Sequence, residues 1–213
     1  MKINLIAVLI GIIISCSTKQ TSTSEVSPLP NNFHSVPKEA LYKEKVSIDT
    51  LFSQKKKLLT VLVKTMNNNE LIRVVNENWP SEIEITYNIL IDSEGRVNRI
   101  SEFPYSESGD WEIMYSHYFD KNGNTFAFER QIRAFNTVCP GEDDFDKLTI
   151  EKIIKLYSPE HAMVDSTYKM TDGQGMDITN KKCQQEVESD NQVFKNLLEY
   201  TRNKNIKTTT NKS

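Results

Sequence analysis

The sequence predicts an α+β domain, in which an antiparallel β-meander packs with an N-terminal and a C-terminal helix that both cover one of its faces. Alternating apolar and polar residues recur between positions 83 and 170, as in strands with one buried face. Three Asp-x-x-Gly segments separate these runs and are typical of tight turns. Segments in which apolar residues have helical spacing flank the series at both ends.

The N-terminal helix is expected over about residues 50–66, where apolar residues recur every three or four positions. These residues are Leu51, Phe52, Leu58, Leu59, Leu62, Val63 and Met66. Asp49 or Thr50 is expected to cap its start. Residues 70–76 leave two alternatives open, a second short helix or an edge strand.

The clearest strand spans residues 83–91, because its odd-numbered positions are apolar and its even-numbered positions are polar through Asn88. The odd-numbered face is therefore expected to be buried and the other face to be exposed. Further strands are expected at 96–103, 111–119, 125–135, 149–157 and 164–170. A closing helix is expected after a cap at Ser189 or Asp190, with an apolar face of Val193 or Phe194, Leu197, Leu198 and Tyr200.

The turns are expected at Asp92–Gly95, Asp120–Gly123 and Asp172–Gly175, with the aspartate bonded to the backbone ahead and the glycine at positive φ. Residues 111–119 are apolar at odd positions, and residues 125–135 are apolar at even positions. The two apolar faces lie on the same side of the sheet only if each odd-numbered residue of the first strand pairs with an even-numbered residue of the second, so that the two residue numbers add up to an odd value. The shortest such hairpin pairs Asp120 with Thr125. It also pairs Phe119 with Phe126, His117 with Phe128, Ile113 with Ile132 and Trp111 with Ala134.

The N-terminus carries an apolar segment from Leu5 to Ile14, after one positive charge at Lys2. Ten helical residues reach only about 15 Å, half the thickness of a bilayer core, so the segment matches the hydrophobic region of a secretory signal. It ends in Ile13-Ile14-Ser15-Cys16, which resembles the lipobox of bacterial lipoproteins, with Ile13 in place of the commoner Leu. An ordinary secreted protein with a cysteine in its signal is the alternative.

The resemblance to bacterial lipoproteins implies cleavage before Cys16 and acylation of that residue, which anchors the protein to a membrane. Ser17 follows, rather than the aspartate that favours retention at the inner membrane, so the outer membrane is the expected location within the cell envelope. The layout is similar to that of small uncharacterised lipoproteins of the Bacteroidota, and this likeness implies no activity.

Composition divides the chain into four parts. Residues 1–15 are the expected signal peptide, and residues 16–39, rich in Ser, Thr, Pro and Asn, are the expected lipidated flexible tether. Residues 40–203 are expected to form a single α+β domain. Residues 204–213 are almost all Lys, Asn and Thr, and are expected to be a disordered tail.

The 26 basic and 29 acidic side chains give a formal net charge of −3, which offers no basic surface for nucleic acid. No two of the three histidines have the spacing of metal ligands, so neither a metal site nor a cofactor is expected, and no catalytic residue is assigned. His117 is expected in the core. The acidic cluster at 142–146 is expected to be a solvated loop rather than a calcium site.

The best candidate for a binding surface is the polar loop that carries Tyr105, Glu107 and Asp110. The expected role is non-enzymatic binding of an envelope protein or glycan. One alternative is an envelope hydrolase that uses Glu107 or Asp110 as an acid, which requires two carboxylates with different pKa values. Another is an immunity lipoprotein whose acidic loop attracts a basic toxin.

If Cys16 is acylated, Cys139 and Cys183 remain as an even pair in an oxidising compartment. Each lies at the end of an expected element, where two segments can approach closely enough for a disulfide. A disulfide between them is therefore predicted, closing a loop of about 45 residues. Two unpaired, buried cysteines are the alternative.

Overall fold

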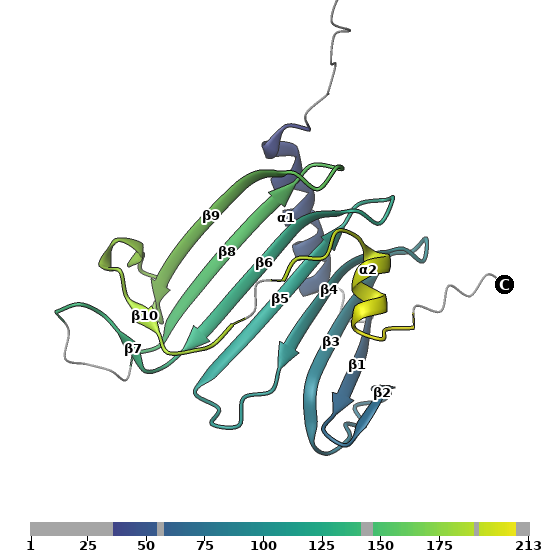
Figure 1. The fold of residues 1–213 in the computed structure, drawn as a ribbon, viewed down its shortest axis with the longest axis horizontal. Coiled ribbons are helices and arrows are strands. Elements are labelled where there is room, and N and C mark those ends of the chain that lie inside the picture. Colours follow the sequence, from purple (N-terminus) through teal and green to yellow (C-terminus); the bar gives the residue numbers. More distant parts are fainter. Residues whose placement is uncertain (1–35, 55–57, 142–146, 190–191, 208–213) are drawn as a thin grey trace, which may run out of the picture. The chain divides into compact units, whose positions relative to one another are not determined.

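The computed structural model describes residues 36–54, 58–141, 147–189 and 192–207. They form a large antiparallel sheet and two α-helices, which agrees with the predicted α+β class (Figure 1). The expected signal peptide, most of the expected tether and the acidic cluster at 142–146 lie outside the described residues. None of the described helices is long and apolar enough to cross a membrane.

The main sheet has eight strands in the order β2-β1-β3-β4-β5-β6-β8-β9. They are β1 (Leu59–Thr65), β2 (Asn68–Arg73), β3 (Ile83–Ile91), β4 (Val97–Pro104), β5 (Trp111–Phe119), β6 (Thr125–Ala134), β8 (Thr149–Tyr157) and β9 (Met163–Asp172). Because β1 lies between β2 and β3, the order departs from a simple meander at this edge. The short strands β7 (Thr137–Val138) and β10 (Gln184–Gln185) pair separately, and a 3₁₀ turn, η2 (Thr179–Lys181), precedes β10.

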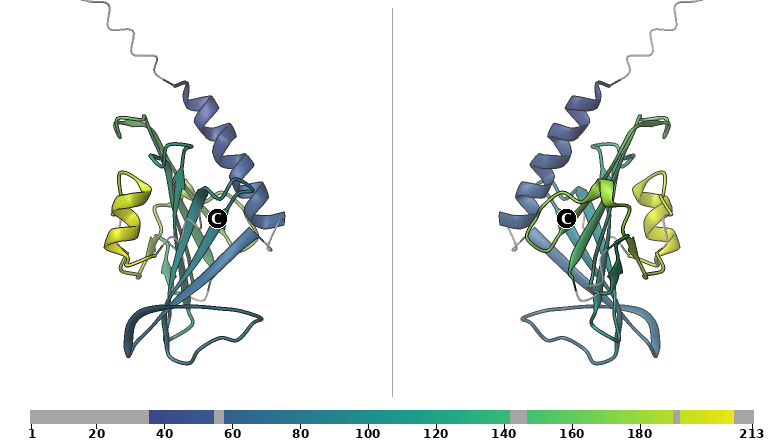
Figure 2. Two further views of the ribbon diagram at one scale, coloured as in Figure 1. Left: turned by 90° about the vertical axis from the view of Figure 1, so that its right-hand side faces the viewer. Right: turned by 90° about the vertical axis from the view of Figure 1, so that its left-hand side faces the viewer.

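The two helices cover opposite faces of the sheet, so the prediction that both cover one face is wrong (Figure 2). Helix α1 (Lys38–Gln54) packs through Leu41 and Ile48 into a cluster that includes Leu90 and Tyr118. Helix α2 (Leu197–Asn203) and the segment before it belong to a second cluster, which contains Ile89, Phe119, Phe194 and Tyr200. Adjacent residues of β3 and β5 therefore pack against different helices, on opposite faces of the sheet. The even-numbered face of β3, which was expected to be exposed, is buried at Leu90.

The helix predicted over residues 50–66 is wrong in its boundaries. α1 starts at Lys38, inside the expected tether, and ends at Gln54, so Asp49 and Thr50 lie within it. Residues 59–65 form β1, which is rich in β-branched residues and pairs with a strand on each side. A strand with apolar side chains on both faces can imitate helical spacing. For residues 70–76 the edge-strand alternative is correct, because β2 lies at the edge of the sheet.

The three Asp-x-x-Gly turns share one geometry, as predicted. In each turn the glycine N–H donates to the aspartate carbonyl over 2.9 to 3.1 Å, and the glycine φ lies between 78° and 86°. The aspartate Oδ1 also accepts the backbone N–H groups two and four residues ahead. The first side chain of each turn therefore fixes the hairpin.

The predicted register of β5 and β6 is confirmed along most of the pair and is wrong beside the turn. His117 pairs with Phe128, Ile113 with Ile132 and Trp111 with Ala134. Phe119 pairs with Thr125 rather than Phe126, and the Asp120 N–H donates to the Asn124 carbonyl at 2.9 Å. An irregularity between Tyr118 and Phe119 restores the predicted faces over the rest of the pair.

The C-terminal helix starts later than predicted. Asn196 caps α2 by accepting the Glu199 N–H at 2.9 Å, whereas Ser189 binds Arg130 at 2.7 Å and Asp190 lies outside the described residues. Leu198, which was expected on the apolar face, is 65% exposed.

The predicted tail begins too early. Ile206 is buried and belongs to the core cluster of α2, and Lys204 forms an ion pair with Glu102 at 2.9 Å. These contacts place residues 204–207 in the folded domain. Residues 208–213 of the predicted tail lie outside the described residues.

Candidate functional site

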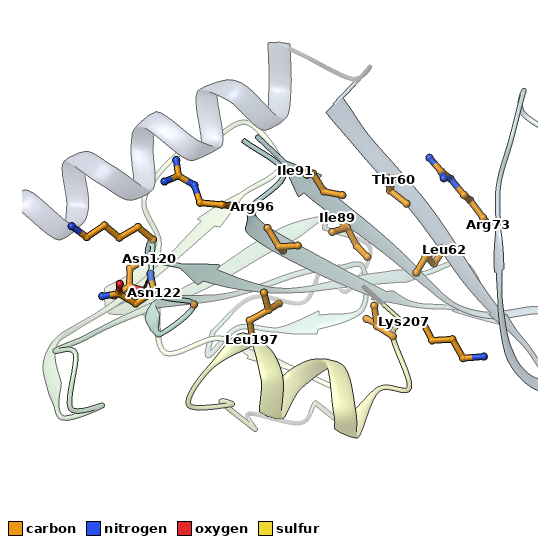
Figure 3. Close-up of a pocket in the computed structure, with 15 residues that line it drawn as sticks. Thr60, Leu62, Arg73, Ile89, Ile91, Arg96, Asp120, Asn122, Leu197 and Lys207 are labelled. Atoms are coloured by element: carbon orange, nitrogen blue, oxygen red, sulfur yellow. Dashed lines mark hydrogen bonds between the residues drawn. The ribbon is translucent and has the colours of Figure 1, made fainter. Parts of the chain in front are cut away.

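A pocket of about 490 Å³ lies between α2 and the end of the main sheet that carries the turns Asp92–Gly95 and Asp120–Gly123 (Figure 3). Its apolar lining is entirely aliphatic and comes from β1, β3, β4, α2 and the segment after α2. The residues are Leu62, Ile89, Ile91, Val97, Leu197 and Ile206. With seven residues, α2 is only about 10 Å long and covers only part of this face, which leaves the hollow beside it.

Charged side chains surround this aliphatic floor. The lining includes Arg73, Arg96, Lys121 and Lys207 but only one carboxylate, Asp120, a formal surplus of three positive charges. Arg96 is partly neutralised, because it forms ion pairs with Asp92 and Glu94 at 2.9 and 3.0 Å. The other three cations are exposed and have no ion pair among the residues that the structure describes.

Backbone contacts hold α2 against the sheet and so shape the pocket. The Leu197 N–H donates to the Gly123 carbonyl at 2.8 Å, and the Thr125 N–H donates to the Lys195 carbonyl at 2.9 Å. Gly123 has a φ of 80°, and a Cβ at this position would lie 3.7 Å from the Leu197 Cβ. The turn Asp120–Gly123 therefore forms part of the pocket lining and also holds α2 in place.

A buried polar cluster lies behind α2. The Tyr200 hydroxyl donates to Glu102 at 3.1 Å, and Lys204 binds the same carboxylate at 2.9 Å. His117 is 2% exposed, as expected of a core histidine, and its Nε2 accepts the Phe194 N–H at 3.2 Å. Burial raises the pKa of Tyr200 well above its ordinary value. The cavity beside His117 is about 40 Å³, enough for water but too small for a substrate.

The buried position of His117 predicts a pH-dependent stability. Burial, followed by the positive charges of Lys204 and His161, lowers the pKa of His117 to about 3. Between about pH 6.5 and 3 the unfolded chain binds a proton at this residue and the folded chain does not, so acid favours unfolding. Relative to His117→Gln, the wild type is expected to lose about 1.4 kcal/mol of stability between pH 7.5 and 5.5, measured by urea unfolding. An unchanged difference at the two pH values would contradict this.

The predicted binding loop borders a separate, open depression of about 660 Å³. Tyr105, which is 55% exposed, lines it together with Met66, Trp111 and Glu112. Asp110 accepts hydrogen bonds from Ser108 of its own loop and, at 3.3 Å, from Asn136 in the segment after β6. Glu107 is exposed and is not among the residues that line the depression. The structure therefore does not bring Glu107 and Asp110 together across a cleft.

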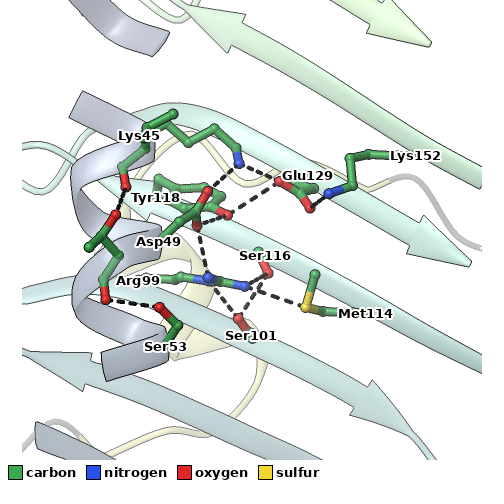
Figure 4. Close-up of polar contacts among 12 residues, drawn as sticks. Lys45, Asp49, Ser53, Arg99, Ser101, Met114, Ser116, Tyr118, Glu129 and Lys152 are labelled. Carbon is green, nitrogen blue, oxygen red and sulfur yellow. Dashed lines mark hydrogen bonds and ion pairs between the residues drawn. The ribbon is translucent and has the colours of Figure 1, made fainter. Parts of the chain in front are cut away.

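A buried charged cluster joins α1 to the sheet on the opposite face (Figure 4). Asp49 of α1 accepts hydrogen bonds from Arg99 of β4 at 2.9 Å and from the Tyr118 hydroxyl of β5 at 2.8 Å. Lys45, one turn earlier, forms ion pairs with Asp49 and with Glu129 of β6. The Lys45 and Arg99 residues are 4% and 5% exposed. Because these charges pair with one another, the cluster is best explained as a structural link.

Glu129 sits at the centre of this cluster as an ionised group. Burial alone would raise its pKa, but the neighbouring Lys45 and Lys152 more than offset this effect and hold the pKa below its ordinary value. Burial likewise raises the pKa of Tyr118, which therefore donates its hydroxyl proton to a carboxylate. Glu129 and Tyr118 therefore meet their partners as a carboxylate and a neutral hydroxyl.

The other predicted site residues are the cysteines. Cys139 and Cys183 form a disulfide bond, as predicted, beside the paired strands β7 and β10. Cys16 lies outside the described residues. Within the described ranges, no group of three or more His, Cys, Asp or Glu side chains is arranged to hold a metal ion.

Sequence reasoning missed the pocket beside α2. Its residues come from positions 60 to 207, and no local pattern links them. The one usable signal was Ile206, a lone large apolar residue in a polar C-terminal segment. The sequence matches no known protein family, and comparisons with curated proteins and with solved structures find no match.

Proposed function

We propose that this protein is a lipid-anchored component of the cell envelope with a non-enzymatic binding role. The anchor is proposed on Cys16 and the location at the outer membrane. Both proposals rest on the apolar segment before Cys16 and on the lipobox-like Ile13-Ile14-Ser15-Cys16. A short apolar segment followed by a cysteine suits an anchor better than a membrane span.

The binding role is supported chiefly by the pocket beside α2. An aliphatic floor of about 490 Å³ with cations at its margin is the arrangement of a ligand site, which combines apolar walls with a few polar groups that orient the ligand. The exposed Tyr105 beside Trp111 and Met66 is a second surface, suited to an envelope protein or glycan. These two surfaces therefore support a binding role better than a catalytic role.

The two alternatives have less support. A carboxylate-based hydrolase needs two acids on either side of a bound substrate, and the Asp110 carboxylate is instead hydrogen-bonded to Ser108 and Asn136. The immunity role depends on the acidic cluster at 142–146, which lies outside the described residues.

The anchor has a direct test. In cells given a fatty-acid probe, the wild-type protein is expected to be labelled and to partition into detergent, because acyl chains on Cys16 supply about 0.8 kcal/mol per buried CH₂. Cys16→Ala is expected to lose both properties. Cys139→Ala with Cys183→Ala is the matched control and should keep the label. Equal labelling of Cys16→Ala and the wild type would refute the anchor.

A further inference from the structure

The pocket beside α2 has a charge opposite to that of the whole chain. The protein carries a formal charge of −3, whereas the pocket lining carries a formal surplus of three positive charges, one of which, Arg96, is paired with Asp92 and Glu94 outside the lining. Arg73, Lys121 and Lys207 belong to its lining, are exposed and have no ion pair among the described residues, and the large apolar residues of the lining are all aliphatic. Such a site suits a ligand with one anionic group and one apolar chain.

We propose that this pocket binds a single-chain alkyl carboxylate, that is, a fatty acid. This inference rests on the proposed binding role and names its ligand class. The chain would lie along Leu62, Ile89 and Ile91, where each buried methylene contributes about 0.8 kcal/mol. The carboxylate would lie at the margin, where the planar guanidinium of Arg73 can bind both of its oxygens.

The composition of the lining favours a fatty acid over a glycan. Sugars are usually bound on aromatic faces, and the residues that line this pocket include none. Its volume, about 490 Å³, lies within the usual range for small-molecule sites. An open, flat protein interface would need a larger apolar surface than this hollow between a short helix and a sheet offers.

The test is isothermal titration calorimetry of the full-length protein carrying Cys16→Ala, so that no acyl chain of its own competes. The probes are decanoate and 1-decanol, which share a chain and differ in charge. Decanoate is expected to bind saturably with one molecule per chain, at least tenfold more tightly than decanol. Added salt is expected to weaken decanoate binding, because it screens exposed charges.

Two sets of variants locate the site. Arg73→Gln with Lys121→Gln and Lys207→Gln is expected to weaken decanoate binding at least tenfold. Lys43→Gln with Arg133→Gln and Lys169→Gln removes the same charges from exposed positions outside the pocket lining, and should change the affinity less than twofold. Thr60→Trp places a large side chain in the pocket at a strand position opposite Ile89, and is expected to abolish binding.

Three outcomes would overturn the fatty-acid site: no saturable binding of decanoate, equal affinity for decanol, or equal loss in the two triple variants. If Thr60→Trp fails to fold, as judged by circular dichroism, the comparison of the two triple variants still shows whether decanoate binds at this pocket. Failure of this experiment leaves the labelling of Cys16 untouched, so the anchor and the ligand are tested separately.

Discussion

Asp49→Asn is expected to lower the free energy of unfolding by about 3 kcal/mol, because it leaves the buried guanidinium of Arg99 without a counter-ion. The same change weakens the contacts of Lys45 and Tyr118 with this position. The value lies at the low end for a broken buried pair, since the Asp49 side chain is 35% exposed and water can partly replace it. Urea unfolding followed by tryptophan fluorescence measures it.

Asp165→Asn provides the matched control for the same helix, because Asp165 of β9 forms a different ion pair with α1. Asp165 pairs with Lys38 of α1 at 3.8 Å, and both side chains are accessible, so its loss is expected to cost less than about 1 kcal/mol. Joint replacement by Asp49→Leu and Arg99→Met should cost less than Asp49→Asn alone, because Arg99 is then no longer a buried charge without a counter-ion, and Lys45 keeps its ion pair with Glu129. Equal effects of Asp49→Asn and Asp165→Asn would show that the cluster under α1 does not hold the helix.

Cys139→Ala with Cys183→Ala is expected to lower the free energy of unfolding by about 2–4 kcal/mol, since the disulfide constrains the unfolded chain. The two cysteines are 44 residues apart, and both are buried with Met170 and Ile178. Alanine keeps the site apolar, so the change in the free energy of unfolding mainly reports the loss of the disulfide bond.

Reduction of the wild type provides the control for the cysteine pair. Urea unfolding of the reduced wild type should approach that of the double variant, and non-reducing mass spectrometry should show the wild type two hydrogens lighter than its reduced form. Retention of full stability by the double variant would contradict a stabilising role of the bond.

The strands and turns were predictable because their signals are local. Alternation gave β3, and β-type runs between turn signals gave β5 and β8, all three with the bounds that they have in the structure; each Asp-x-x-Gly segment forms the turn expected of it. The register of β5 and β6 followed from matching two apolar faces and failed only beside the turn, where an irregularity lengthens one strand.

The position of α1 was not predictable, because part of the surface under it is polar. Arg99, Ser101 and Ser116 mark that side of the sheet as solvent-exposed, yet all three are buried. The helix that covers them places Lys45 on its own inner face, so its apolar pattern is interrupted. Lys45 and Arg99 can be buried only because they form ion pairs between α1 and the sheet, and such pairs between distant segments leave no local signal in the sequence. The pocket was missed for a related reason, since its lining is assembled from distant segments.

The strand order also bears on how the chain folds. From β3 to β6, neighbours in the sheet are consecutive in the chain, and two of their three connections are tight turns closed by one aspartate. Contacts that are close in sequence form early, because closing a short loop costs little entropy. The helices depend on distant partners, such as Asp49 with Arg99 across 50 residues and Tyr200 with Glu102 across 98. A central set of hairpins is therefore expected to form first, with the two helices docking onto it afterwards, one on each side.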